Sequence, residues 1–258
     1  MIQFLLRKNL LNLYNNANCG HIACSLSCID ILYILFNNKL DSERVILSKG
    51  HAAGALYVIL NYFGEISDEE LSTFYKNGTK LSAHPSANSF INIPFALGSL
   101  GHGLPIACGI ALAKKNDQSN EFVYVIMSDG ETNEGTTWEA AHFAVSNELS
   151  NLIVCIDQNR LQGFGELTNI LGDTSDRIKW ESIGFEVFEI DGHNLEILSE
   201  CLATCKSLTT SRPKLIIANT VKGKGVDFME NKMEWHYLPM TGDQYDNSIR
   251  SIEKNYHA

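Results

Sequence analysis

The second half of the chain alternates short apolar runs with segments of helical periodicity. Apolar runs that predict strands occur at 122–127, 152–157, 186–190 and 214–219. Segments that predict helices lie between and around them, at 136–150, 176–183 and 195–207. Strands without a polar face, alternating with helices, are typical of a parallel sheet covered on both sides. The pattern therefore predicts an α/β fold with a doubly wound, mostly parallel sheet.

The first half is predominantly helical. The first forty residues have apolar positions at helical spacing, with a break at 18–21. A short strand is predicted at 44–47, and helices are predicted at 52–62 and 105–115. Ser67 and Glu70 have the spacing of a capping box, which predicts the start of another helix.

Composition and charge limit the possible classes of protein. The chain has 258 residues, of which 45% are hydrophobic, and this is ample for one large core. We find no repeat and no linker, so we expect a single domain over 1–258, with a flexible C-terminal loop and arm from about 221. The net charge of -10 argues against nucleic-acid binding. No apolar run reaches the roughly 18 residues of a membrane helix.

The seven cysteines include no Cys-x-x-Cys pair. Cys24 and Cys28 are one helical turn apart, as are Cys201 and Cys205, and this spacing favours packed thiols over a zinc site. The N-terminal segment has charged residues in its apolar pattern and no cleavage site typical of a signal peptide. We therefore expect a reducing, cytoplasmic location.

Possible metal ligands stand at the ends of two predicted strands. Asp129 and Gly130 follow the run at 122–127, and Asn159 follows the run at 152–157. Ligands of a doubly wound sheet bind beyond the carboxyl ends of its strands, so these side chains can converge. One carboxylate and one amide oxygen suit Mg²⁺, which takes its other oxygens from phosphate and water. From spacing alone, a plain turn and polar loop residues explain the same positions equally well.

Four of the eight histidines lie in predicted loops or at helix starts, namely His21, His51, His84 and His236. A single histidine in such a place is more often a capping or surface residue. Four in one α/β chain favour a functional role, because imidazole transfers protons and orients hydroxyl groups near neutral pH. A zinc cluster is the weaker alternative, since none of the four shows tight ligand spacing.

Three glycine-containing segments have structural explanations. The turn at 98–103 does not fit the dinucleotide fingerprint, because Ile106 stands where a third glycine is required. The segment at 191–194 predicts a cap for the helix from 195. The sequence Lys222-Gly223-Lys224-Gly225 could contact a phosphate, but we interpret it as a mobile, solvated loop.

Taken in order, these segments resemble the N-terminal half of transketolase, a thiamine-diphosphate enzyme. The cofactor signature of that superfamily, Gly-Asp-Gly and then Asn after about thirty residues, corresponds here to Ser128-Asp129-Gly130 and Asn159. Segments typical of transketolase lie at 47–52, 83–85, 98–101, 191–193 and 220–225. The match extends over nearly the whole chain.

The resemblance implies a thiamine-diphosphate-binding fold and specific roles for residues. Asp129, Asn159 and the backbone carbonyl of Leu161 would bind Mg²⁺, or Ca²⁺ or Mn²⁺ in its place. The cofactor would be bound by His51, Gly98, Leu100, Asp129, Gly130 and Asn159. The catalytic residues would be His21, His51, His84 and His236. The implied activity is that of a transferase, which moves a two-carbon ketol unit from a ketose phosphate to an aldose acceptor.

Two departures from the family pattern affect the expected substrate more than the cofactor. The family usually has His-Pro-Gly-Gly where this chain has His21-Ile22-Ala23-Cys24, so the first histidine loop can be shaped differently. The family also usually has Gln where His102 stands, and this histidine could add a titrating donor near the phosphates.

The resemblance further implies a second polypeptide. Full-length transketolases are more than twice this length, and their second domain supplies a glutamate for the cofactor ring and arginines for the sugar phosphate. We therefore expect a split transketolase, an α2β2 assembly in which this chain pairs with a C-terminal, pyrimidine-binding subunit. The alternatives are a subunit of a deoxyxylulose-phosphate synthase or of a 2-oxo-acid decarboxylase, or a non-catalytic cofactor-binding partner.

Overall fold

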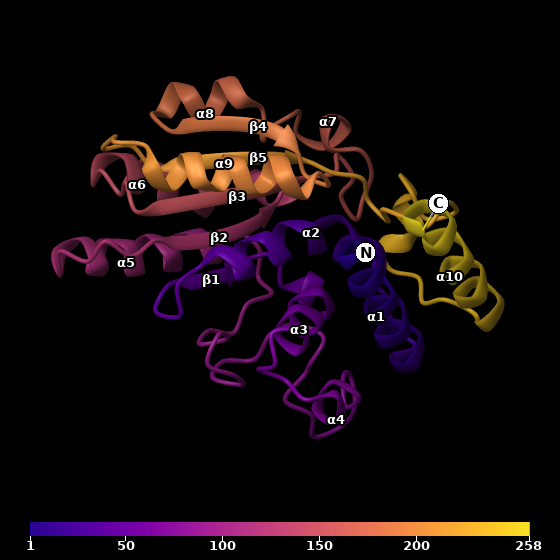
Figure 1. Cartoon of the computed structure of the whole chain (residues 1–258). Coiled ribbons are helices and arrows are strands. Elements are labelled where there is room, and N and C mark those ends of the chain that lie inside the picture. The colour runs from indigo at the N-terminus through magenta and orange to yellow at the C-terminus, as the bar shows by residue number, and fades with distance from the viewer. Residues whose placement is uncertain (258) are drawn as a thin grey trace.

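The computed structural model describes residues 1–257 and contains a five-stranded sheet in the order β1-β2-β3-β5-β4 (Figure 1). The strands are β1 (Arg44–Leu47), β2 (Val123–Ser128), β3 (Leu152–Gln158), β4 (Glu186–Asp191) and β5 (Lys214–Asn219). Every neighbouring pair is parallel. The predicted α/β fold with a parallel sheet is confirmed.

The two faces of the sheet are covered by different helices. Alternate residues of β2, such as Tyr124 and Ile126, belong to a core with α1 (Ile2–Ala17), α2 (Ile22–Asn38), α3 (Ala53–Tyr62) and α9 (Leu195–Ser207). The other residues of β2, such as Val123 and Val125, belong to a second core on the opposite face, with α5 (Gly103–Asn116), α6 (Gly135–Ser146) and α8 (Arg177–Ile183). The period of two along each strand thus produces two cores, as expected of a doubly wound sheet.

The connections between these strands and helices contain the remaining short elements. These are η1 (Gly50–Ala52), α4 (Asp68–Leu71), η2 (Gly130–Asn133), α7 (Leu167–Ile170) and η3 (Met233–His236). The break between α1 and α2 lies where the pattern predicts it, with Asn18 and His21 in the left-handed backbone region. The predicted capping box at Ser67 and Glu70 is present, and Asn194 caps α9.

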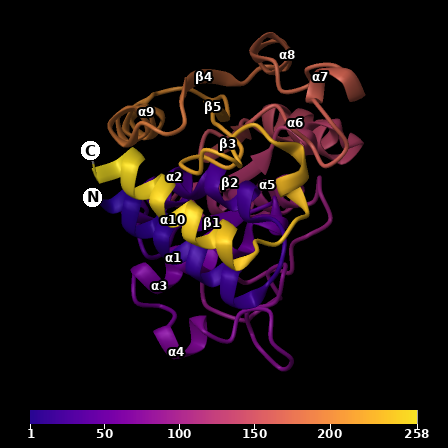
Figure 2. The ribbon, with the colours of Figure 1, turned by 90° about the vertical axis from the view of Figure 1, so that its right-hand side faces the viewer.

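The end of the chain differs from the expected loop and arm. It forms α10 (Gly242–His257), which packs beside α1 in both views (Figures 1 and 2). Tyr245 donates a hydrogen bond to Asn12 over 2.6 Å, and Ile252 is buried. Most residues of α10 are polar, and its few apolar residues form a narrow stripe that packs against α1. Across residues 1–257, no helix is long and apolar enough to cross a membrane.

Candidate active site

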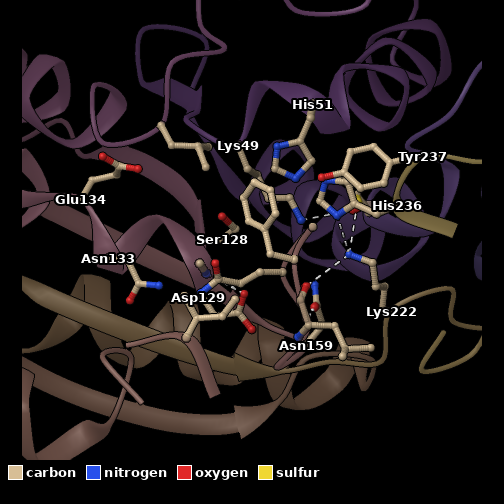
Figure 3. A pocket seen from close by; sticks show the side chains of 18 of the residues that line it. Lys49, His51, Ser128, Asp129, Asn133, Glu134, Asn159, Lys222, His236 and Tyr237 are labelled. Atoms are coloured by element: carbon tan, nitrogen blue, oxygen red, sulfur yellow. Dashed lines mark hydrogen bonds between the residues drawn. The ribbon is translucent and has the colours of Figure 1, made fainter. Parts of the chain in front are cut away.

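The carboxyl ends of β2 and β3 meet at one cavity of about 420 Å³ (Figure 3). The register pairs Ser128 with Asp157, so the next residues of both strands reach the same edge of the sheet. Asp129, Asn159 and Leu161 all line this cavity. The structure therefore brings together the three residues that the resemblance assigns to the metal.

Asp129 is a buried carboxylate without a cationic side chain bound to it among the described residues. One carboxylate oxygen accepts a hydrogen bond from the Gly130 amide at 2.7 Å, and the other accepts one from the Arg160 amide at 2.5 Å. Burial, together with the neighbouring Asp157 charge, raises the pKa of Asp129 to about 6. At this pKa the carboxylate is mostly ionised at pH 7, and a cation in the cavity would stabilise its charged form further.

The donors around Asp129 fit a hard divalent cation. The carboxylate, the Asn159 amide oxygen and the Leu161 carbonyl are all oxygen ligands, which Mg²⁺ and Ca²⁺ prefer. The Leu161 amide donates to the Asn159 Oδ1 over 3.1 Å and thereby orients that side chain. A single protein carboxylate leaves coordination positions for phosphate oxygens and water.

The glycine-rich segment that follows β5 is not the mobile, solvated loop that we expected, because Lys222 is buried. Its side chain is 1% exposed and lines the cavity. The Lys222 Nζ donates to the Leu161 carbonyl over 3.2 Å and lies 3.0 Å from the His236 Nδ1. Sequence spacing could not place this ammonium, because its partners are far away along the chain.

The four singled-out histidines gather next to this cavity. The ring centre of His21 lies 5.6 Å from that of His51, 6.1 Å from that of His84 and 5.2 Å from that of His236. Burial lowers the pKa of His51 to about 4, so its ring is neutral at pH 7. A second cavity of about 220 Å³ opens between His21, His51 and His84 and adjoins the first at His51 and Tyr237. The arrangement can bind a polyhydroxylated substrate and transfer protons.

The sequence reasoning missed Cys24 as a member of this group. Its thiol is buried at the cavity, 3.4 Å from the Lys222 Nζ and 3.5 Å from the His236 Nδ1. Burial alone would raise the pKa of this thiol, but the Lys222 charge and hydrogen bonds from three histidines lower it well below its ordinary value. The only sequence signal was its position three residues after His21.

Gly98 and Leu100 line the same cavity. A side chain at Gly98 would come within 3.0 Å of the His84 ring, and one at Gly50 would come within 2.4 Å of the Leu97 carbonyl. These close approaches pack the turn at 98–101 against the loop that carries His51. The His102 ring is exposed and contacts, at 3.1 Å, the carbonyl of Leu100, which lines the cavity.

Glu131 holds the turn at 98–101 in place through hydrogen bonds. It is buried, its carboxylate accepts from the Gly101 amide over 2.8 Å, and Ser48 donates to the same oxygen. These hydrogen bonds lower the pKa of Glu131, but the effect of burial is larger and raises the pKa to about 7. This residue thus joins three segments that line the cavity, and no motif in the sequence marked it.

Comparison with known proteins agrees with this geometry. Residues 5–255 match the family model described as "Transketolase, thiamine diphosphate binding domain". The chain belongs to the transketolase family.

Two relatives from this family have nearly the same length as the chain. An apulose-4-phosphate transketolase subunit of Phocaeicola vulgatus is 36% identical, over 96% of this chain and 91% of the relative. The 6-deoxy-6-sulfo-D-fructose transketolase subunit of a Clostridium species is 34% identical, over 97% of this chain and 94% of the relative.

A solved transketolase has the same fold as this chain. The crystal structure of the transketolase from Campylobacter jejuni superposes with a TM-score of 0.88 and 28% identity. The match covers 97% of this chain but 42% of that transketolase. The fold of this chain is thus that of the thiamine-diphosphate-binding N-terminal part of a transketolase.

Proposed function

We propose that the chain is the diphosphate-binding subunit of a transketolase divided between two polypeptides. The observation that carries this proposal is the convergence of a buried, unpaired Asp129 and a histidine cluster on one cleft. The first feature suits a metal-bound diphosphate, and the second suits a sugar. Relatives of nearly the same length that are named as transketolase subunits support the division.

The oxygen ligands anchor one end of the cofactor in this proposal. Asp129, Asn159 and the Leu161 carbonyl hold Mg²⁺, and the backbone at Gly130 comes close to the diphosphate. Gly98 and Leu100 pack along the cofactor, and the Lys222 ammonium adds a positive charge beside the diphosphate. When bound, thiamine diphosphate supplies the carbanion chemistry for the two-carbon ketol transfer.

The histidines handle the substrate in the same proposal. His21, His51, His84 and His236 bind the hydroxyl groups of the ketose and transfer protons as the carbon–carbon bond breaks and re-forms. Neutral His51 can accept a proton at pH 7, because burial keeps its pKa at about 4. Among these residues His84 is the most exposed, which suits a position at the entrance for the sugar phosphate.

The cleft also supports a partner subunit. Phe164, Leu171 and Tyr237 line the main cavity, yet their side chains are 86%, 64% and 53% exposed. Large apolar side chains at a cavity mouth are typical of a protein interface. We propose that a C-terminal, pyrimidine-binding subunit covers them and activates the cofactor ring, in an α2β2 assembly. The free, buried thiols suit a cytoplasmic enzyme.

The decisive experiment is to co-express this chain with the product of an adjacent reading frame and to assay the purified pair. We expect two-carbon transfer that depends on thiamine diphosphate and Mg²⁺, and no turnover by this chain alone. Robust ketol transfer by the single chain contradicts the division. A pair that binds the cofactor but transfers nothing indicates a non-catalytic partner, and decarboxylation of a 2-oxo acid indicates another thiamine enzyme.

The sugar donor requires a panel of ketoses. The names of the relatives suggest apulose 4-phosphate and 6-deoxy-6-sulfo-D-fructose, beside the pentulose phosphates of general sugar metabolism. Product analysis with each donor and several aldose acceptors, comparing kcat/KM between donors, identifies the preferred sugar.

A further inference from the structure

A second group of metal-ligand side chains lies on the histidine side of the cleft. His21, Cys24 and His236 each offer one ligand atom, and these atoms all lie within 4.8 Å of one another. The Cys24 Sγ and the His236 Nδ1 are 3.5 Å apart. In a tetrahedral site with Zn–S of about 2.3 Å and Zn–N of about 2.0 Å, a sulfur and a nitrogen ligand are about 3.5 Å apart. The pair therefore has the separation of two ligands of one zinc ion.

The donor atoms of this group suit a different metal from the oxygen ligands around Asp129. The His21 Nδ1 is buried and has no hydrogen-bond partner among the described residues, and Cys24 is not in a disulfide. Imidazole nitrogen and thiolate sulfur favour Zn²⁺, whereas the oxygens of Asp129 and Asn159 favour Mg²⁺. One cleft thus contains two groups of ligands with opposite metal preferences.

The position between these donors already holds a positive charge. The Lys222 Nζ lies 3.4 Å from the Cys24 Sγ, 3.0 Å from the His236 Nδ1 and 3.2 Å from the Leu161 carbonyl. The Lys222 ammonium therefore lies against the same sulfur and nitrogen atoms that a metal ion would bind. A metal ion bound to the same sulfur and nitrogen requires the Lys222 ammonium to move away, and the flexible side chain of lysine allows this.

We propose that His21, Cys24 and His236 form a Zn²⁺ site that is separate from the Mg²⁺ site and competes with the Lys222 ammonium. Binding forms a Zn–S bond to the Cys24 thiolate, and a proton that is still on the sulfur is released to solvent. Three protein ligands leave the fourth position of the tetrahedron to water. An occupied site withdraws His21 and His236 from proton transfer and so inhibits the enzyme; this consequence, unlike the binding itself, rests on the proposed function.

Cobalt spectroscopy on the purified chain tests the binding. The protein is treated with a chelator, supplied with excess Mg²⁺ to fill the oxygen site, and titrated with Co²⁺. We expect visible bands of tetrahedral Co²⁺ and a near-ultraviolet sulfur-to-cobalt band, both removed by Zn²⁺. Substituting a residue that only hydrogen-bonds to a metal ligand changes metal affinity by about 10–100-fold. Cys24→Ala removes a ligand itself, so it should weaken Co²⁺ binding by at least about 100-fold and abolish the near-ultraviolet band.

Two further variants make the test specific. Cys28→Ser alters the thiol one turn along α2, which donates hydrogen bonds to the backbone carbonyls of Cys24 and Ser25, and should bind Co²⁺ like the parent. Lys222→Met removes the competing ammonium and should tighten Co²⁺ binding. Circular dichroism verifies that each variant is folded.

Two results would overturn the proposed zinc site. One is an octahedral Co²⁺ spectrum without a sulfur band, lost in Asp129→Asn, which would place the ion at the oxygen ligands. The other is unchanged affinity in Cys24→Ala. Inhibition of the reconstituted pair by Zn²⁺, relieved in Cys24→Ala, is measured separately, so that failure of the activity assay leaves the binding result intact.

Discussion

Two buried aspartates at neighbouring strand ends, Asp129 and Asp157, have opposite electrostatic environments. Asp157 receives the Lys49 ammonium, the Thr220 hydroxyl and, at 2.6 Å, the Ser27 hydroxyl. Its burial would raise its pKa, but these partners lower it below the ordinary value. Asp129 receives two backbone amides and no side-chain cation among the described residues, and its pKa is raised to about 6.

The difference separates a structural carboxylate from the one that we propose as a metal ligand. Burying a charge is costly unless it is paired, so Asp157 with Lys49 is electrostatically complete inside the protein. Asp129 has no cationic side-chain partner among the described residues, and its carboxylate lines the cavity that we assign to the metal and diphosphate. Equivalent substitutions at the two positions should therefore have different consequences.

The largest expected effect is the loss of cofactor binding in Asp129→Asn. Removing a direct metal ligand should weaken Mg²⁺-dependent thiamine-diphosphate binding by at least about 100-fold. The free energy of unfolding should stay within about 1 kcal/mol of the parent, because the relief of an unpaired charge offsets a lost hydrogen bond. Calorimetric titration and urea unfolding measure the two quantities. Unchanged cofactor affinity would refute the metal assignment.

The opposite result is expected for Asp157→Asn, which should destabilise the fold. The substitution leaves the Lys49 ammonium buried without its counter-charge, at a cost of roughly 3–5 kcal/mol in the free energy of unfolding. The double variant Lys49→Met with Asp157→Asn should recover part of this loss, since no lone charge remains buried. Urea unfolding of the four proteins tests both statements, and additive losses would show that the two residues are not coupled.

A third buried aspartate, Asp30, extends the comparison to acid conditions. It pairs with Arg7 at 2.5 Å and with the His193 ring at 2.8 Å. Although burial would raise the pKa of Asp30, the Arg7 and His193 partners lower it to about 2, below its ordinary value of 3.8.

The pH dependence follows from this lowered pKa. The unfolded chain binds the proton first, so the stabilisation is complete above about pH 4 and is lost as the pH falls through about 2. Asp30 should contribute roughly 2 kcal/mol to the difference in unfolding free energy between pH 5 and pH 2. Unfolding measured at both pH values, in the parent and in Asp30→Asn, should show a smaller difference in the variant. An identical difference would contradict the assignment.

The smallest expected effect tests a single hydrogen bond to the Asp157 carboxylate. Thr220→Val removes one hydroxyl donor to this carboxylate and should lower the free energy of unfolding by about 1.5 kcal/mol. Thr210→Val, at a position where the hydroxyl accepts from the Arg212 amide on the surface, is the matched control and should change it by less than about 0.5 kcal/mol. Equal effects at both positions would show that the Asp157 hydrogen bond adds nothing beyond a surface contact.

Much of the fold was predictable because its signals are local. The apolar strands, the capping box before Asp68 and the break before Ile22 each depend on neighbouring residues. The segment after 221 was misjudged, because the burial of Lys222 and the packing of α10 depend on partners more than 190 residues away, Cys24 and Asn12. Periodicity within a segment contains no information about such partners.

The sequence by itself determined the order of strands and helices along the chain, the candidate metal-ligand residues at two strand ends and the membership of the transketolase family. Only the tertiary structure decided that Asp157 has a cationic partner while Asp129 has none within residues 1–257, and that Cys24 and Lys222 join the histidines. The physical reason is that the charge state of a buried group depends on what lies within a few ångströms of it in space. Residues that are remote in the sequence supply those neighbours.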